Sequence, residues 1–157
     1  MGLCLEDVEV GKVYELGSYH FTRDNIIEFA RKFDPQDFHL DDEAAERGPF
    51  GKLTASGWHT AAGWMKGFVA ANQRAEETLR SAGREVFVVG PSPGFTNLKW
   101  PRPVCPGDTV TYRSTITGKR ELVTRVRWGM VFAFNEGHNQ RGELVYSFEG
   151  KVLAPRR

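Results

Sequence analysis

The sequence predicts an α+β fold in which an antiparallel sheet wraps around one long central helix. Two observations carry this prediction. Apolar residues in the first half of the chain recur at the three-and-four spacing of helices, and those in the second half alternate with polar residues as in half-buried strands. A length of 157 residues suits one domain better than two, so we assign residues 1–157 to a single domain.

Composition narrows the class of protein. The chain has 21 basic and 20 acidic residues, and this balance argues against a nucleic-acid partner, which calls for a basic excess. Its two cysteines, Cys4 and Cys105, form no disulfide framework and suit a reducing, cytoplasmic location. We find neither a signal peptide nor an apolar run long enough to span a membrane, and therefore expect no membrane association.

The first elements follow from local signals. Residues 13–21 predict a short strand, and Thr22 is suited to cap the helix that follows. Apolar residues at helical spacing continue to Phe33, and Pro35 pushes Asp34 out of the helical conformation. The helix should therefore end at about Phe33. Residues 42–47 are expected to add one or two helical turns.

The long helix is predicted to begin near Ser56 or Gly57. Its buried face is marked by apolar residues at helical spacing: Trp58, Ala61, Ala62, Met65, Phe68 and Val69. Glycines and alanines make its first half narrow, so this half can lie close to a curved sheet.

Four further strands are predicted from the second half of the chain, at about 95–100, 109–117, 126–134 and 144 to the C-terminus. Turns at 107–108, at 118 and at 139–142 separate these four strands from one another. In the third of these strands the large residues alternate strictly, which predicts that they face the core: Val126, Trp128, Met130, Phe132 and Phe134.

One short segment carries residues suited to acid–base chemistry. Asp34 and His39 lie on either side of a turn that follows a helix end and contains a proline. A carboxylate and an imidazole that share one water can take up and return a proton near neutral pH. Taken by itself the spacing also fits a helix-ending aspartate and an ordinary loop histidine.

The same segment, residues 33–39, resembles the hydratase motif of the MaoC-like dehydratases, which are related to (R)-specific enoyl-CoA hydratases. Asp34 and His39 match the catalytic Asp and His of that motif. Three positions differ: Gln36 stands where Asn is usual, Asp37 where Pro is usual, and Phe33 where Gly is usual.

The resemblance extends over about residues 10–153, which we take as the core of the domain. Residues 50–59 resemble the family's loop into its central helix, and Gly57 matches the position whose backbone N–H is the oxyanion donor. The free N–H groups and the dipole of a helix N-terminus suit that role. Residues 100–110 resemble a strand–turn–strand element of hot-dog proteins, so the resemblance implies a hot-dog fold.

The resemblance also implies a hydro-lyase that interconverts enoyl-CoA and 3-hydroxyacyl-CoA. Asp34 and His39 would be the acid–base pair, and Gly57 would stabilise the thioester oxygen. No metal or bound cofactor is implied, since coenzyme A enters as part of the acyl-CoA substrate. An open sheet edge that a second copy can continue predicts at least a homodimer.

Four further residues are candidates for substrate contact. Gln36 lies within the motif, and Ser56 either only caps the long helix or also bonds to substrate or to His39. Lys99 and Arg102 either meet the phosphates of coenzyme A or form a solvated edge.

Two other functions stay open on the same fold: an acyl-CoA thioesterase and a non-catalytic acyl-CoA-binding protein. The remaining histidines, His20, His59 and His138, are interpreted as structural or exposed. His39, His59 and Asp34 match no zinc spacing.

Overall fold

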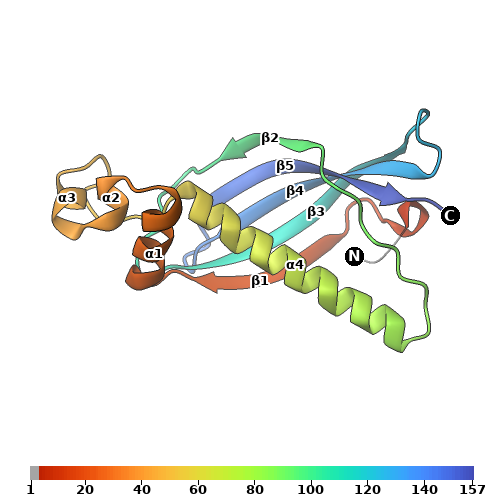
Figure 1. Ribbon diagram of the computed structural model, residues 1–157, viewed down its shortest axis with the longest axis horizontal. Helices are drawn as coiled ribbons and strands as arrows, with labels where there is room; N and C mark the ends of the chain where they lie inside the picture. Colours follow the sequence, from red (N-terminus) through yellow and green to blue (C-terminus); the bar gives the residue numbers. More distant parts are fainter. Residues whose placement is uncertain (1–3) are drawn as a thin grey trace.

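The computed structural model describes residues 4–157, in which one long helix crosses one face of a five-stranded sheet (Figure 1). The predicted antiparallel sheet around a long central helix is confirmed. The elements in chain order are η1 (Leu5–Asp7), β1 (Val13–His20), α1 (Arg23–Phe33), α2 (Asp37–Leu40), α3 (Asp42–Glu46), α4 (Gly57–Ser81), β2 (Gly94–Lys99), β3 (Thr109–Glu121), β4 (Trp128–His138) and β5 (Leu144–Pro155).

The strands lie in the order β1-β3-β4-β5-β2, and every neighbouring pair is antiparallel. β2 and β1 are therefore the two edges of the sheet. The helices α1, α2 and α3 gather at one end of the molecule, beside the start of α4 (Figure 1). In the described part of the chain no helix is long and apolar enough to cross a bilayer.

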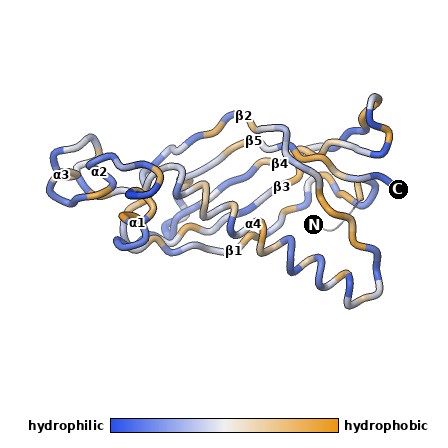
Figure 2. Tube along the Cα trace, in the orientation of Figure 1, coloured by the Kyte–Doolittle hydropathy of each residue, from blue (hydrophilic) through white to orange (hydrophobic). Residues whose placement is uncertain are grey.

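Small residues allow α4 to lie close against the sheet. A Cβ added at Gly67 would come within 2.7 Å of the Leu16 carbonyl oxygen, and one at Gly63 within 2.8 Å of the Tyr112 hydroxyl. The predicted narrow first half of the helix is thus confirmed. The last turns of α4 extend beyond the sheet and are hydrophilic (Figure 2).

The prediction for the face of β4 was wrong for Val126, Phe132 and Phe134, whereas Met130 is buried as predicted. The strand begins at Trp128 rather than at Val126, which is 72% exposed. Its smaller side chains face α4, namely Val131, Ala133 and Asn135, while Phe132 and Phe134 point to the opposite face. Val131, Ala133 and Asn135 therefore mark the face of β4 that lies under α4.

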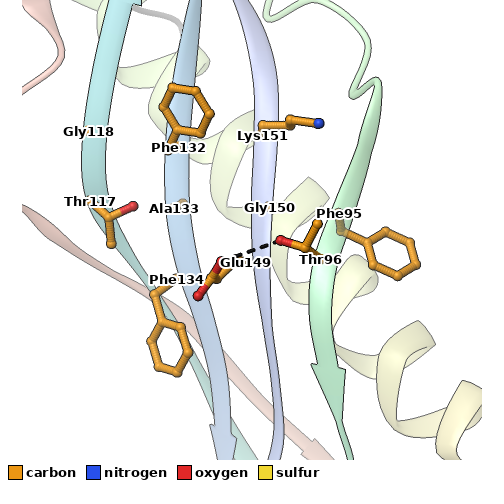
Figure 3. Close-up of a pocket in the computed structure, with 10 residues that line it drawn as sticks. All are labelled: Phe95, Thr96, Thr117, Gly118, Phe132, Ala133, Phe134, Glu149, Gly150 and Lys151. Atoms are coloured by element: carbon orange, nitrogen blue, oxygen red, sulfur yellow. Dashed lines mark hydrogen bonds between the residues drawn. The ribbon is translucent and has the colours of Figure 1, made fainter.

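The opposite face of the sheet carries an open hollow of about 640 Å³ (Figure 3). Phe132, Phe134 and Lys151 line it, and Thr96 donates a hydrogen bond to Glu149 across the strand pair at 3.3 Å. This hollow is separated by the sheet from α4 and therefore from the segment that carries Ser56 and Gly57.

Candidate active site

Asp34 is placed by the end of α1. The capping oxygen of Thr22 accepts from the Asn25 N–H at 3.1 Å, and the helix ends at Phe33, as predicted. Asp34 still donates its N–H to the Ala30 carbonyl at 2.9 Å, but its φ of −153° and ψ of 68° leave the helix. Its side chain therefore projects from the end of α1, and is 20% exposed.

His39 lies on a helix that the sequence interpretation missed. The expected turn contains α2, a single helical turn, and the His39 side chain is only 7% exposed. Its Nδ1 lies 2.7 Å from the Thr54 carbonyl oxygen. A carbonyl oxygen only accepts hydrogen bonds, so Nδ1 carries a hydrogen. Nε2 faces Asp34 Oδ2 at 3.5 Å, and in the neutral ring it is an acceptor.

Two side chains hold the Asp34 carboxylate. Ser56 Oγ donates to Oδ2 at 2.7 Å, and Gln36 Nε2 donates to Oδ1 at 2.8 Å. Ser56 Oγ also accepts from the Trp58 N–H at 3.2 Å and so caps α4. Ser56 therefore caps the helix, as expected, and also forms a hydrogen bond within the site. Its partner there is Asp34 and not His39.

These contacts favour the ionised form of Asp34. Burial raises the pKa of the carboxyl, but the hydrogen bonds from Ser56 and Gln36 and the facing His39 together outweigh it. The pKa of Asp34 is therefore held below its usual value. The group is a carboxylate at neutral pH and can accept hydrogen bonds from a water or a substrate hydroxyl.

Gly57 is the first residue of α4. Its N–H has no acceptor within the helix, as is usual at a helix N-terminus, and the helix dipole favours negative charge there. Because the preceding residue, Ser56, bonds directly to Asp34, the helix terminus and the carboxylate belong to one group. The structure therefore brings Asp34, His39, Ser56 and Gln36 together, with Gly57 adjoining them along the chain.

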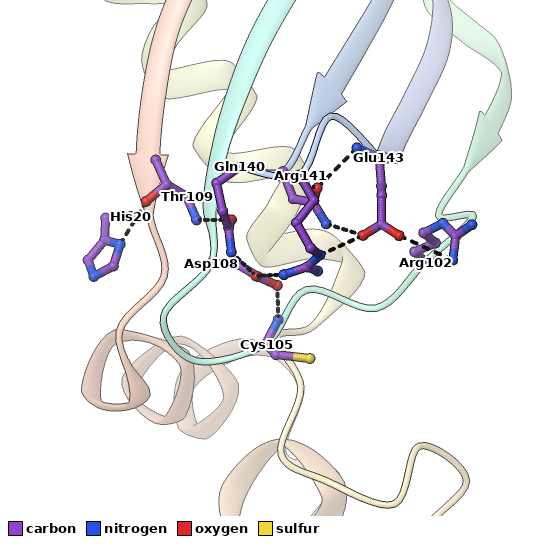
Figure 4. Close-up of polar contacts among 9 residues, drawn as sticks. His20, Arg102, Cys105, Asp108, Thr109, Gln140, Arg141 and Glu143 are labelled. Carbon is purple, nitrogen blue, oxygen red and sulfur yellow. Dashed lines mark hydrogen bonds and ion pairs between the residues drawn. The ribbon is translucent and has the colours of Figure 1, made fainter.

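A polar network holds the backbone beside this group. Ala55 donates its N–H to the Val104 carbonyl at 2.8 Å, which ties the segment before α4 to the loop after β2. That loop is fixed in turn by Asp108, whose Oδ2 accepts from the Cys105 N–H at 2.9 Å and whose Oδ1 accepts from Gln140 at 2.8 Å (Figure 4).

Lys99 and Arg102 lie outside the group. Lys99 ends β2 and is exposed, and Arg102 lies 3.6 Å from Glu143 (Figure 4). Neither contacts Asp34, His39 or Gly57, and their contact with coenzyme A stays a prediction.

His59 is enclosed by aromatic rings. It stacks on Phe29 at a centroid distance of 4.5 Å, and burial lowers its pKa to about 4. It is a neutral core residue at physiological pH, as interpreted from the sequence. Within residues 4–157 no three His, Cys, Asp or Glu side chains gather as metal ligands.

A mostly apolar cavity of about 280 Å³ runs between α4 and the sheet. Its α4 lining starts at Trp58, the residue after Gly57, and extends to Phe68. The cavity and the oxyanion candidate thus share the first turn of the helix. Sequence reasoning did not place this cavity, because its lining comes from four strands far apart in the chain.

The arrangement of the fold and site can be compared with known proteins. The model of the MaoC-like domain matches residues 7–128. The chain belongs to the MaoC-like domain family. Its fold is accordingly the hot-dog fold, and the MaoC-like members among its structural neighbours are described as dehydratases.

Three known proteins show what the chain is similar to. A crystal structure of a MaoC-like dehydratase from Rhodospirillum rubrum is 34% identical, covers 99% of both chains and has a TM-score of 0.77. YdeM of Bacillus subtilis strain 168, an uncharacterized protein, is 27% identical over 97% of this chain and 99% of its own. The R-hydratase PhaJ1 from Pseudomonas aeruginosa is 20% identical, covers 99% of this chain and 88% of its own, and has a TM-score of 0.65.

Proposed function

We propose that this protein is a cytoplasmic hydro-lyase that interconverts enoyl-CoA and 3-hydroxyacyl-CoA by adding or removing water. The proposal rests on one observation: Asp34 Oδ2 and His39 Nε2 face each other at a distance of 3.5 Å, beside the N-terminus of α4. A carboxylate and an imidazole at this distance can both bond to one water. Membership of the MaoC-like family supports this reaction class.

Hydration divides the proton transfers between the two side chains. Asp34 accepts a proton from the water as the water oxygen bonds to C3 of the enoyl chain, and the π electrons move toward the thioester oxygen. In this reaction His39 begins as an imidazolium, with a hydrogen on Nε2 as well as on Nδ1. It then gives the Nε2 proton to C2 on the same face. A proton passes from Asp34 to His39, and both groups are restored; dehydration runs through the same steps in reverse.

The negative charge on the thioester oxygen needs a donor that is fixed in advance. The N–H of Gly57 is suited to this role, because it lies at a helix N-terminus and its helix is anchored by the Ser56 cap. Removing one such donor from an enzyme costs roughly 3–4 kcal/mol of transition-state stabilisation. The coenzyme A part of the substrate supplies no chemistry beyond the thioester, and Lys99 and Arg102 are proposed to meet its phosphates.

A homodimer is part of the proposal. β2 has a partner on one side only, and apolar side chains are exposed beside this open edge: Phe95 on β2, Trp100 after it, and Trp58 and Met65 on α4. A second copy that continues the sheet at β2 would cover them. Light scattering coupled to size exclusion should give twice the monomer mass, and a monomer would refute this part.

An absorbance assay with a short enoyl-CoA tests the reaction. Loss of the conjugated thioester absorbance without release of free thiol is the result we expect. Thiol release would instead identify a thioesterase, and no change over a series of chain lengths would leave a non-catalytic binding protein.

Asp34→Asn should lower the hydration rate by two or more orders of magnitude, because the base is lost. Asp37→Asn is the matched control, since Asp37 is an exposed carboxylate only three residues away in sequence. Equal turnover by Asp34→Asn and the native protein would place the base elsewhere.

A further inference from the structure

The cavity beneath α4 holds polar groups in surroundings that are otherwise apolar. Ser114 on β3 and Asn135 on β4 are paired across the strands, and Tyr146 on β5 lies on the same inner face. Trp64 of α4 covers them from the opposite side. Four buried side chains that can form hydrogen bonds therefore line one cavity of about 280 Å³, and Ser92 and Lys151 also belong to its lining.

These groups are buried and largely without partners. Ser114 is 2% exposed, Tyr146 is 3% exposed and Trp64 is 8% exposed. The Trp64 indole N–H is buried and has no acceptor. The hydroxyls of Ser114 and Tyr146 line the cavity, and within residues 4–157 neither of them forms a hydrogen bond to the protein. Asn135 uses one amide N–H, which it donates to the Ala133 carbonyl at 3.3 Å. A buried donor without a partner costs about 1–3 kcal/mol, so the Trp64 indole N–H calls for an explanation, and the two hydroxyls that face the same cavity supply a context for it.

The four groups share a chemical bias. An indole N–H only donates, and serine and tyrosine hydroxyls each have a proton to donate. Replacing the two hydroxyls with methyl or hydrogen would cost the fold nothing in hydrogen bonding. A ligand oxygen placed among them would satisfy several donors together, whereas a plain hydrocarbon chain would leave the Trp64 N–H and the two hydroxyls without a partner.

We infer that this cavity selects acyl chains that carry an oxygen function, a keto or carboxylate group remote from the thioester, over plain hydrocarbon chains of equal length. The inference rests on the proposed function in one respect, because that function makes the cavity the acyl site. Trp58 is the structural link between the two, because it lines the cavity and directly follows Gly57 in the first turn of α4. The polar groups fix which chains fit, while Asp34 and His39 carry out the reaction.

Binding of saturated thioesters tests this selectivity without turnover. Calorimetric titration would compare pentanoyl-CoA with 4-oxopentanoyl-CoA and with glutaryl-CoA, which differ only at the far end of the chain. We expect at least one oxygen-bearing probe to bind about tenfold or more tightly than pentanoyl-CoA. The two oxygenated probes distinguish a neutral keto group from a carboxylate.

Two variants connect the preference to the cavity. Tyr146→Phe and Ser114→Ala should each reduce the ratio of the two affinities, and together they should bring it close to one. Because neither hydroxyl has a partner, both variants should unfold at the same temperature as the native protein or at a higher one. Ser147→Ala is the control, since Ser147 neighbours Tyr146 but alternates to the other face of β5.

Equal or tighter binding of pentanoyl-CoA would overturn the inference, as would a preference that survives the double variant, or no binding of any probe. These failures are separable from failure of the proposed function. Hydration that depends on Asp34, combined with an affinity ratio near one, would refute the selectivity alone. A selective cavity in a protein that hydrates no enoyl-CoA would refute the reaction alone.

Discussion

Trp100 lies so close to Gly57 that a Cβ added to the glycine would come within 2.7 Å of the indole ring. The ring belongs to the loop after β2, and the glycine is the first residue of α4. Glycine is therefore required here for packing, independently of any oxyanion role. The same contact fixes the direction in which the helix leaves the site, and hence where its free N–H groups point.

Gly57→Ala should destabilise the protein by about 1–3 kcal/mol, because the added methyl group overpacks against Trp100. The higher helix propensity of alanine offsets less than about 1 kcal/mol of this. Denaturant unfolding measures the change, and the double variant Gly57→Ala with Trp100→Leu should recover stability. Native-like stability of Gly57→Ala alone would show that the indole ring moves aside without cost.

Ser56→Ala should shift the acid limb of the hydration profile to higher pH. The Ser56 hydroxyl is one of the bonds that hold the pKa of Asp34 down, so its removal raises that pKa. As pH falls, Asp34 is then protonated earlier and loses its function as a base. A pH profile of kcat/KM measures the shift, and Ser56→Thr should restore the native limb because it keeps a hydroxyl.

His59 should make the fold less stable in mild acid. Its pKa is about 4 in the buried site and 6.5 when unfolded, so between these values only the unfolded chain takes up the proton. Stability therefore falls as pH drops from 6.5 toward 4, by about 3 kcal/mol in total from this group. In His59→Phe that part of the pH dependence should vanish, whereas the exposed His20→Phe should retain it.

Local signals in the sequence were sufficient for most elements. The Thr22 cap and Pro35 set both ends of α1, because capping and proline sterics act within a few residues. The orientation of β4 was not predictable in the same way. The face of β4 that lies under α4 depends on the position of a helix far away in the chain, and the alternation of large residues within the strand does not record that position.

In the candidate site, too, contacts between residues close in the sequence could be predicted, and contacts between distant residues could not. Asp34 and His39 are five residues apart, so their association could be predicted from the segment itself. Their partners could not: Ser56 reaches Asp34 across 22 residues, and the Thr54 carbonyl reaches His39 across 15. The turn at 107–108 could be predicted from the sequence, but the bond from the Ala55 N–H to the Val104 carbonyl, which ties this loop to the segment before α4, joins residues far apart in the chain.

Gln36 stands in place of the usual asparagine and donates a hydrogen bond to Asp34 Oδ1 at 2.8 Å. Substitutions at this position test whether Gln36 helps to orient Asp34 or whether Ser56 does so alone. Gln36→Ala should lower kcat about tenfold and raise the pKa of Asp34, since one of its two side-chain donors is lost. Gln36→Asn tests whether the shorter amide reaches the same oxygen, and recovery of the native rate would show that it does. An unaltered pH profile in Gln36→Ala would mean that Ser56 alone orients Asp34.

Asp37 is the other unusual position of the motif. It is exposed and makes no contact with the Asp34 carboxylate, so Asp37→Pro should change stability more than kcat.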